Sequence, residues 1–225
     1  MAQAGMHALV SLPLRKWAGA RGEWLMLGLV LGSMFPDADN LAVAVAVLTK
    51  TSSAGLHRTF THSLFTAALV VLVFFLVGQI TKRPRWTNLG VGLGVGILIH
   101  ILLDLVLWFD GVAILWPIPF TLNLWTNITP PAWWMTLMMP LELLFFALFF
   151  VSLDFLARRK GSDLGFLTKL RGWTILQAGL FVVFLVLAFV MTKGFLTIFG
   201  AVYLLSLGLA AGIAIRMRKT IEQAA

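Results

Sequence analysis

The chain has 225 residues, of which 60% are hydrophobic and only 12% are charged, and its mean hydropathy is +0.96. Soluble domains carry about 25% charged residues, so this composition excludes an ordinary soluble protein and indicates one that crosses a membrane several times. The net charge of +8 does not indicate a nucleic-acid partner, because the basic residues lie in short connections between apolar runs.

The apolar runs predict an all-α, polytopic membrane bundle. A short stretch at 4–14 is below the ~20 residues that cross a bilayer, so we expect it to form a half-spanning helix. About six longer runs follow, and Pro36 interrupts the first of them, since proline ends or kinks a helix. No repeat or second domain is visible, so residues 1–225 are expected to form a single membrane domain. The expected spans are 23–48, 63–80, 88–109, 136–156, 173–192 and 194–215.

The basic residues predict the orientation of the bundle. All Lys and Arg residues except Lys50, Arg58 and Lys193 lie in alternate connections. By the positive-inside rule these connections are cytoplasmic, as are the N-terminal basic turn and the C-terminus of a plasma- or inner-membrane protein. Residues 57–63 and 110–135 then lie on the outer side. The cytoplasmic set is Arg15, Lys16, Arg21, Lys82, Arg83, Arg85, Arg158, Arg159, Lys160, Lys169, Arg171, Arg216, Arg218 and Lys219.

The glycine-rich run at 90–96 (GVGLGVG) lies inside an apolar run with no strand before it, so it is not a nucleotide-binding loop. Gly90 and Gly94 are four residues apart, as are Gly92 and Gly96. Small residues at this spacing predict a face on which two helices pack closely.

The scarce ionisable residues gather in the first half of the chain. An ionisable side chain at membrane depth is costly, and its default interpretation is functional. The absence of cysteine excludes thiolate metal sites, which leaves imidazole nitrogens and carboxylate oxygens as ligands. The residues concerned are His7, Asp37, Asp39, His57, His62, His100 and Asp104.

Two short motifs suggest metal ligands. His100 and Asp104 are four residues apart, so they share a helix face and suit one metal ion, although a hydrogen-bonded His–Asp pair has the same spacing. Asp37 and Asp39 repel each other unless a cation lies between them or one is protonated. We therefore expect at least one of them to be a ligand, with a solvated, helix-capping turn as the alternative.

The heptad HRTFTHS, residues 57–63, is the densest polar motif. His57 and His62 are about 140° apart on an ideal helix, so we expect His57 and Arg58 in a loop and His62 at the start of the next helix. Thr61 is the expected N-cap of that helix. The forked guanidinium of Arg58 suits an anionic group such as phosphate, or else a lipid head group.

The order of these motifs resembles that of the predicted membrane-bound metal-dependent hydrolases, the YdjM-like family that includes a LexA-regulated inner-membrane member. The shared pattern is an N-terminal His, then Pro-Asp-x-Asp, His-Arg-x-x-Thr-His-Ser, His-x-x-x-Asp and Gly-Val-x-x-Leu-Trp-Pro. Asn40 stands where members often have His. The resemblance implies a metal-site half, 1–120, and a helical scaffold, 121–225. The matching positions are His7, 36–39, 57–63, 100–104 and 111–117.

The same order is similar, more distantly, to the zinc-dependent phospholipase C and single-strand nuclease group. That likeness implies zinc, and His and Asp ligands also accept Mn²⁺ or Fe²⁺. The candidate ligands are His7, Asp37, Asp39, His62, His100 and Asp104, and the candidate catalytic residues are Asp39, His57 and Arg58.

The function expected first is a membrane-embedded hydrolase in which a metal ion activates water. A site at the outer boundary of the bilayer favours a lipid or lipid-linked phosphoester, with Arg58 holding the anion and Asp39 or His57 as general base. One alternative is a metal-ion or proton transporter or channel that uses the same cluster, for which Glu142 is a further candidate. The other is a non-catalytic, metal-stabilised membrane protein.

Overall fold

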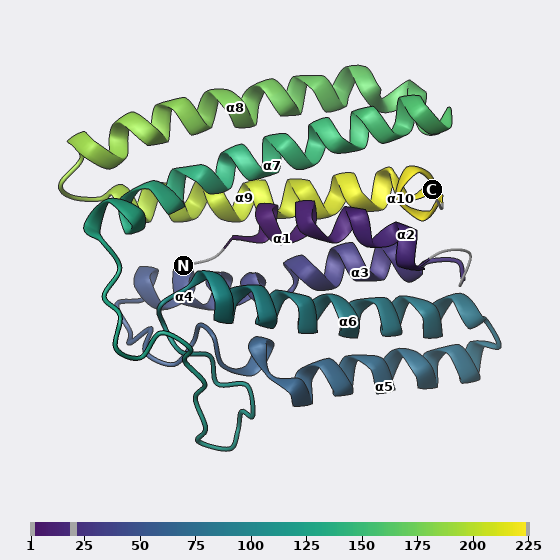
Figure 1. Cartoon of the computed structure of the whole chain (residues 1–225), viewed down its shortest axis with the longest axis horizontal. Coiled ribbons are helices and arrows are strands. Elements are labelled where there is room, and N and C mark those ends of the chain that lie inside the picture. Colours follow the sequence, from purple (N-terminus) through teal and green to yellow (C-terminus); the bar gives the residue numbers. More distant parts are fainter. Residues whose placement is uncertain (1–2, 19–21, 224–225) are drawn as a thin grey trace.

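The structure, a computed structural model, describes residues 3–18 and 22–223. Within these ranges the chain is helical, apart from its connections and one isolated antiparallel bridge between Val112 and Leu122. The helices run roughly along one direction, so the connections gather at the two ends of the bundle (Figure 1). The helices are α1 (Ala4–Ser11), η1 (Leu12–Leu14), α2 (Arg15–Ala18), α3 (Leu25–Met34), η2 (Pro36–Asp39), α4 (Asn40–Leu48), η3 (Phe60–His62), α5 (Leu64–Thr81), α6 (Pro84–Leu107), α7 (Ala132–Lys160), η4 (Leu164–Phe166), α8 (Leu167–Val190), α9 (Phe195–Arg216) and α10 (Arg218–Glu222).

The long helices confirm the predicted membrane bundle. In the described part of the chain, α5 to α9 are each long and apolar enough to cross a bilayer. A sixth candidate span consists of α3 and α4, which are bent by 42° at the break between them. The break falls at Pro36, as expected, because proline has no amide hydrogen to continue the helix. The short N-terminal helix is also present as α1 and η1.

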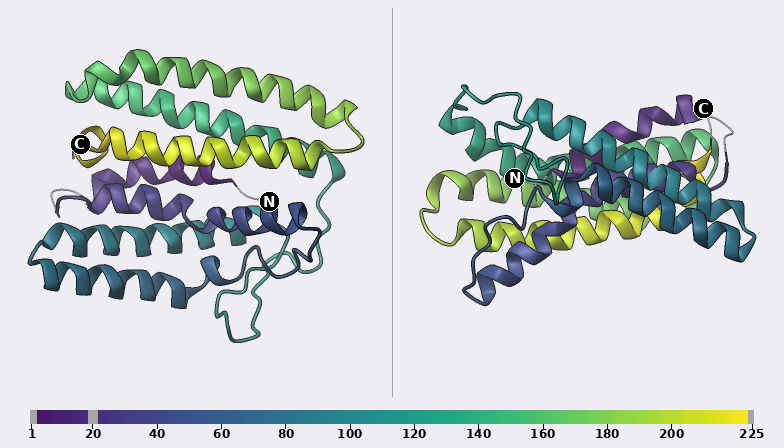
Figure 2. Two further views of the ribbon diagram at one scale, coloured as in Figure 1. Left: turned by 180° about the vertical axis from the view of Figure 1, so that it is seen from behind. Right: turned by 90° about the horizontal axis from the view of Figure 1, so that it is seen from below.

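The layers of the bundle place α1 in its interior. Helices α5 and α6 lie on one side and α7 and α8 on the other, with α1, α3 and α9 between them (Figures 1 and 2). Helix α1 contacts both α3 and α7. One apolar core includes Ala4 and Leu12 of the first half together with Phe146 and Phe150 of the second. The two halves of the sequence therefore share a core, and α1 lies where they meet.

The glycines of α6 form the predicted packing face. A Cβ atom on Gly92 or Gly96 would overlap the backbone of α3, and reciprocally a Cβ on Gly32 would overlap Leu93 of α6. On another side of α6, Gly90 and Gly94 leave room for side chains of α5. Close backbone approach of this kind needs residues without a side chain. It fixes α6 against α3 one turn before His100.

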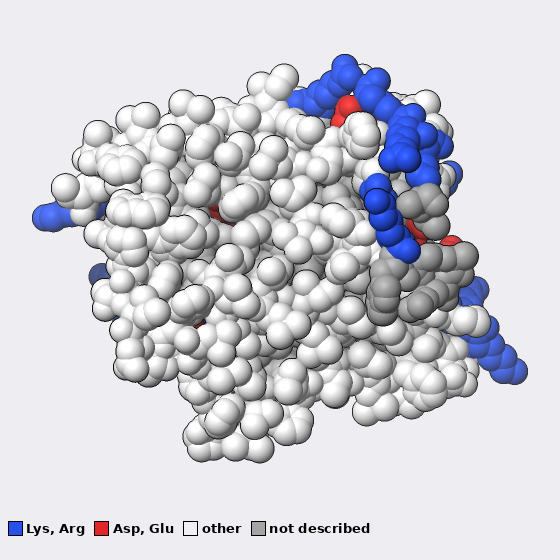
Figure 3. Space-filling view, in the orientation of Figure 1, with Lys and Arg blue, Asp and Glu red and all other residues white. Residues whose placement is uncertain are grey.

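The basic residues mark one end of the bundle. Lys and Arg side chains gather where the α5–α6 and α7–α8 connections and α10 lie, whereas the opposite end shows few of them (Figures 1 and 3). Arg21, part of the predicted cytoplasmic set, lies outside the described residues. The end with few basic residues carries the end of α4 and the long connection between α6 and α7.

Candidate metal centre

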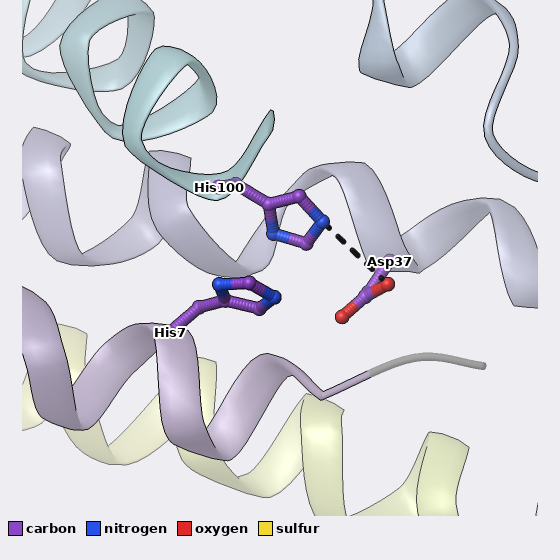
Figure 4. A group of neighbouring side chains, drawn as sticks. All are labelled: His7, Asp37 and His100. Carbon is purple, nitrogen blue, oxygen red and sulfur yellow. Dashed lines mark ion pairs between the residues drawn. The ribbon is translucent and has the colours of Figure 1, made fainter. Parts of the chain in front are cut away.

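Four separate segments bring the polar residues of the first half together. His7 comes from α1, Asp37 from the break at η2, His62 from η3, and His100 and Asp104 from α6. All five side chains are buried. Figure 4 shows how His7, Asp37 and His100 converge from their three segments. The spacing of four between His100 and Asp104 puts both on the face of α6 that looks into this cluster.

The side-chain atoms of the cluster are close enough to share a cation. The rings of His7 and His100 are stacked, with their centroids 3.8 Å apart. His7 Nε2 lies 3.3 Å from Asp104 Oδ1, and His100 Nε2 lies 3.7 Å from Asp37 Oδ1, the contact dashed in Figure 4. The Nε2 atoms of His62 and His100 are only 3.1 Å apart, a distance at which they share a proton or face a common ion.

Within the described part of the chain, three overlapping groups of residues could each hold a metal ion. In each group the ligand atoms lie within 4.8 Å of one another. Each pair of groups shares one residue, so the cluster is continuous. The groups are His7, Asp37 and His100; Asp37, His57 and His62; and His62, His100 and Asp104.

Several of these buried atoms have no hydrogen-bond partner in the structure. They are both ring nitrogens of His7, Asp37 Oδ1, His57 Nε2 and both carboxylate oxygens of Asp104. A buried polar atom without a partner costs about 1–3 kcal/mol, and buried charges are normally paired or coordinate metals. Imidazole nitrogens and carboxylate oxygens are the donors that Zn²⁺ and similar divalent ions accept. The residues present therefore fit a divalent ion.

The sequence matches the family described as YdjM inner membrane protein over residues 2–197. The chain belongs to this family. The match includes every residue of the cluster, and together with the apolar helices it makes the chain a multi-pass inner membrane protein. Neither the curated proteins nor the solved structures contain a significant match to it.

Hydrogen bonds orient three of the four histidines of this YdjM-family protein. His100 Nδ1 lies 2.7 Å from the carbonyl oxygen of Ser33, which only accepts, so Nδ1 carries the hydrogen and Nε2, which faces His62, keeps the lone pair that a ligand needs. Asp39 places one carboxylate oxygen 2.7 Å from His57 Nδ1 and the other 3.3 Å from His62 Nδ1. Asp39, expected as a ligand or a base, lies outside the three groups and beside two of their histidines.

The heptad follows most of the expected arrangement, with one correction. His57 and Arg58 lie in the loop, and His62 lies in the 3₁₀ turn just before α5. The N-cap of α5 is Ser63, whose Oγ accepts a hydrogen bond from Phe65 N at 3.2 Å. The prediction of Thr61 was wrong, because the turn at η3 delays the start of the helix. The Thr61 hydroxyl instead donates to Asp39 Oδ2 at 2.9 Å.

Arg58 forms one wall of the cluster. Its side chain is only 5% exposed, with Nε 3.3 Å from Asp104 Oδ2 and the guanidinium 5.5 Å from the centre of the Trp108 ring. Its Nη1 reaches Asp110, which is 68% exposed, and His57 is 21% exposed. The cluster therefore reaches solvent beside His57 and Asp110, at the end of the bundle with few basic residues.

The carboxylates around His62 also change its acidity. Burial by itself lowers the pKa of the His62 imidazole, but Asp104 and Asp39 outweigh that effect and raise the pKa to about 9. A metal ion that uses His62 as a ligand must displace this proton.

Sequence reasoning missed three contributors to the cluster. The Ser33 carbonyl orients His100, and a backbone atom leaves no trace in a motif. Gln3 N donates to Asp37 Oδ2 at 2.9 Å, and only the position of Gln3 just before an apolar stretch hinted at it. Glu142, expected only as a further candidate for a transport path, accepts a hydrogen bond from the backbone of α1.

Proposed function

We propose that this protein is a metal-dependent hydrolase that cleaves a phosphoester of a lipid or lipid-linked substrate. The observation that carries the proposal is the convergence of buried His and Asp atoms that lack hydrogen-bond partners beside a buried guanidinium. The buried carboxylates of Asp37, Asp39 and Asp104 lie in or beside the cluster, and the guanidinium of Arg58 contacts one of them, Asp104. This excess of negative charge favours divalent cations, and Zn²⁺ is the first choice for a His and Asp donor set, with Mn²⁺ or Fe²⁺ as alternatives.

The ligands follow from the three groups. We assign His7, Asp37, His62, His100 and Asp104 to metal binding. When bound, a divalent ion supplies Lewis acidity towards a phosphoryl oxygen and makes water a nucleophile near neutral pH. The Ser33 carbonyl and Asp39 contact Nδ1 of His100 and of His62, which leaves Nε2 of each ring to hold an ion, as the outer hydrogen-bond partners of metal ligands do.

His57 and Asp39 have the geometry of a general base and its orienting carboxylate. The 2.7 Å contact between Asp39 Oδ1 and His57 Nδ1 fixes the ring, and the same contact stabilises the imidazolium that forms when His57 takes a proton. Arg58 lies across the cluster, and its Nη2 has no hydrogen-bond partner in the structure. It is placed to donate to a phosphoryl oxygen.

The surroundings of the opening favour an amphiphilic substrate. Phe60 and Trp116 lie against each other, with ring centroids 5.3 Å apart, and are 44% and 40% exposed. Aromatic side chains of this kind sit at the lipid–water boundary. By the positive-inside rule this end faces away from the cytoplasm. A lipid head group would reach His57 and Arg58 without leaving the interface.

The transporter alternative has no observation of its own in its favour. Glu142, its candidate outside the cluster, accepts a hydrogen bond from the backbone of α1. Towards the basic end, the described core between α1, α3 and α7 is largely apolar, with residues such as Leu12, Val30 and Phe149. The buried Ser11 and Ser33 of this core donate to carbonyl oxygens of their own helices.

The test combines metal analysis with a substrate panel. Protein purified in detergent without chelator should carry at least one transition metal per chain and hydrolyse at least one of a phospholipid, a lipid-linked diphosphate and a soluble phosphodiester. The same protein after chelation, and after metal is restored, is the control. Metal without hydrolysis of any of them, but with metal flux in proteoliposomes, would favour the transporter; absence of metal would exclude the metal-dependent hydrolase.

The orientation has its own test, because the chain contains no cysteine. Single cysteines at Ala54 and Thr121 should react with a membrane-impermeant thiol reagent in intact cells. One at Gly165 should react only after permeabilisation. The opposite pattern would place the opening in the cytoplasm.

A further inference from the structure

The start of α1 is held by side chains and backbone of other segments. Glu142 of α7 is fully buried, and its Oε1 accepts a hydrogen bond from Gly5 N at 2.6 Å. Gln3 N donates to Asp37, and Gln3 Nε2 donates to the carbonyl oxygen of Met138, also on α7, at 2.9 Å. Two carboxylates thus bond backbone amides at the N-terminus of one short helix.

These contacts meet a physical need of α1. The first amides of a helix have no partner within it, and the side chain of Gln3, the N-cap residue, makes no capping hydrogen bond. Within a bilayer there is no water to replace such a bond, and a carboxylate is favoured at the positive end of the helix dipole. An isolated helix of 8 residues is not stable by itself. The position of α1 therefore depends on what binds its first turn.

His7 depends on that position more than the other histidines do. Its ring has no hydrogen bond to either nitrogen in the structure, whereas His57, His62 and His100 are each oriented by Asp39 or by a backbone carbonyl. Gly5, two residues earlier, packs so closely that an added Cβ would lie 2.8 Å from Phe146 N of α7. The docking of α1 on α7 is thus what places His7 against His100 and Asp104.

We propose that Glu142 is a positioning residue for the metal centre: it fixes the first turn of α1 on α7 and so places His7 as a ligand. This inference rests on the metal site of the proposed function. It assigns part of that site to the second half of the chain, which contributes none of the ligands.

The experiment compares Glu142→Leu, which removes the acceptor, with Glu142→Gln, which keeps an oxygen for Gly5 N. Gln177→Leu is the matched control, because Gln177 is also buried in the second half and bonds Ser206 at 3.0 Å away from the cluster. The first measurement is the affinity of chelator-treated protein for Zn²⁺ and Co²⁺. The second needs no metal: spin labels on cysteines at Val10 of α1 and Leu148 of α7, both partly exposed, report the distance between the two helices.

Glu142→Leu should lower metal affinity by about tenfold or more, as loss of supporting contacts does in metal sites, and should broaden the distance distribution. Glu142→Gln should bind metal within about threefold of the wild-type affinity, because the amide oxygen still accepts from Gly5 N and the supporting contact is kept. Gln177→Leu should leave both readouts unchanged even where it lowers the thermal midpoint. In a His7→Ala background, Glu142→Leu should cause no further loss of metal affinity, because Glu142 affects metal binding through His7.

A second variant guards against loss of folding in Glu142→Leu. Gly5→Ala keeps Glu142 but forces α1 away from Phe146, so it should weaken metal binding and broaden the distances in the same way. Wild-type affinity and distances in both Glu142→Leu and Gly5→Ala would overturn the inference, as would equal losses in Glu142→Leu and Gln177→Leu. If the wild type bound no metal, the proposed function would fail, and the distance measurement would still decide whether Glu142 positions α1.

Discussion

Two prolines inside apolar runs show how differently the two halves of the chain are built. At Pro36 the helix gives way to a 3₁₀ turn and the span bends by 42°, whereas α7 continues through Pro140 for its full 29 residues. Proline alone therefore does not open a helix here. After Pro36, Asp37 binds the amide of Gln3, and Asn40 donates to the Asp37 carbonyl at 2.9 Å. Polar contacts from Gln3, in another segment, and from Asn40, at the start of α4, stabilise the first break.

The same contrast applies to buried polar groups. In the second half, Gln177 and Ser206 bond each other across α8 and α9, so the pair is satisfied within the scaffold. In the first half, His7, Asp37 and Asp104 keep atoms without a hydrogen-bond partner in the structure. Buried polar atoms without a partner also occur in the second half, on Trp134, Glu142 and Tyr203. Among the described residues, however, the groups of His and Asp side chains that could hold a metal ion all lie in the first half. Four predictions examine this difference.

The largest effect is expected for Asp104→Ala. Asp104 lies within 3.3–3.5 Å of His7, Arg58 and His62, so its loss removes a ligand and leaves a buried guanidinium without its partner. Metal affinity should fall by more than about 100-fold, beyond the range for supporting residues. Elemental analysis and the thermal midpoint measure the two consequences. Asp154→Ala is the control, since Asp154 pairs with Arg158 at the surface of the second half. Full metal content in Asp104→Ala would remove this ligand from the site.

Asp39→Asn should have the next largest effect. The amide keeps the size of the carboxylate but no longer accepts from both His57 and His62, so metal affinity should fall by about 10–100-fold. Activity should fall further than metal occupancy at saturating metal, because His57 also loses its orienting charge. Thr61→Val, which removes a donor to Asp39 and a contact to His62 Nδ1 at 3.0 Å but keeps the carboxylate, is the milder control. An unchanged affinity in Asp39→Asn would show that the two histidines are held by other contacts.

Gly96→Ala should destabilise the protein by about 1–3 kcal/mol, the usual cost of overpacking. Its new Cβ would overlap the Leu29 carbonyl of α3 and push α6, with His100, away from Ser33. The matched change in the second half is Gly212→Ala, which meets open space and should be neutral or slightly stabilising. Denaturation midpoints compare the pair. Equal effects would mean that the close approach of α3 and α6 does not limit stability.

The last prediction concerns the pH dependence of metal affinity. Because the pKa of His62 is raised to about 9, binding between about pH 7 and 9 displaces its proton, so affinity should rise with pH by up to about tenfold per unit and level off above it. In the chelated protein, folding stability changes with pH in the opposite direction. Asp104 and Asp39 stabilise the protonated form of His62. The contribution of this group to folding stability is therefore greatest below the ordinary pKa of an imidazole and is lost as pH rises through about 9. Proton release on Zn²⁺ binding measures the first effect, and its absence at pH 8 would contradict the assignment of His62.

The sequence by itself determined the helices and the ingredients of the site. Apolar runs of membrane length are local signals, so the spans and the short N-terminal helix could be predicted. The glycine spacing predicted the close packing of α6 for the same reason. The break at Pro36 could be predicted because two aspartates, Asp37 and Asp39, follow the proline, whereas no such pair follows Pro140. The motifs also named the residues of the cluster, since ionisable side chains at membrane depth are rare.

Only the tertiary structure decided which atom meets which. Asp37 and Asp39 are two residues apart in sequence, yet the turn at η2 directs Asp37 to His100 and Gln3, and Asp39 to His57 and His62. Ser63, and not Thr61, is the N-cap of α5, because a 3₁₀ turn precedes this helix. The Ser33 carbonyl and Glu142 reach the site from 67 and 137 residues away along the chain. Such contacts depend on the register in which the helices pack. The close backbone approach of α3 to α6 and of α1 to α7 fixes that register, and a local sequence pattern does not predict it.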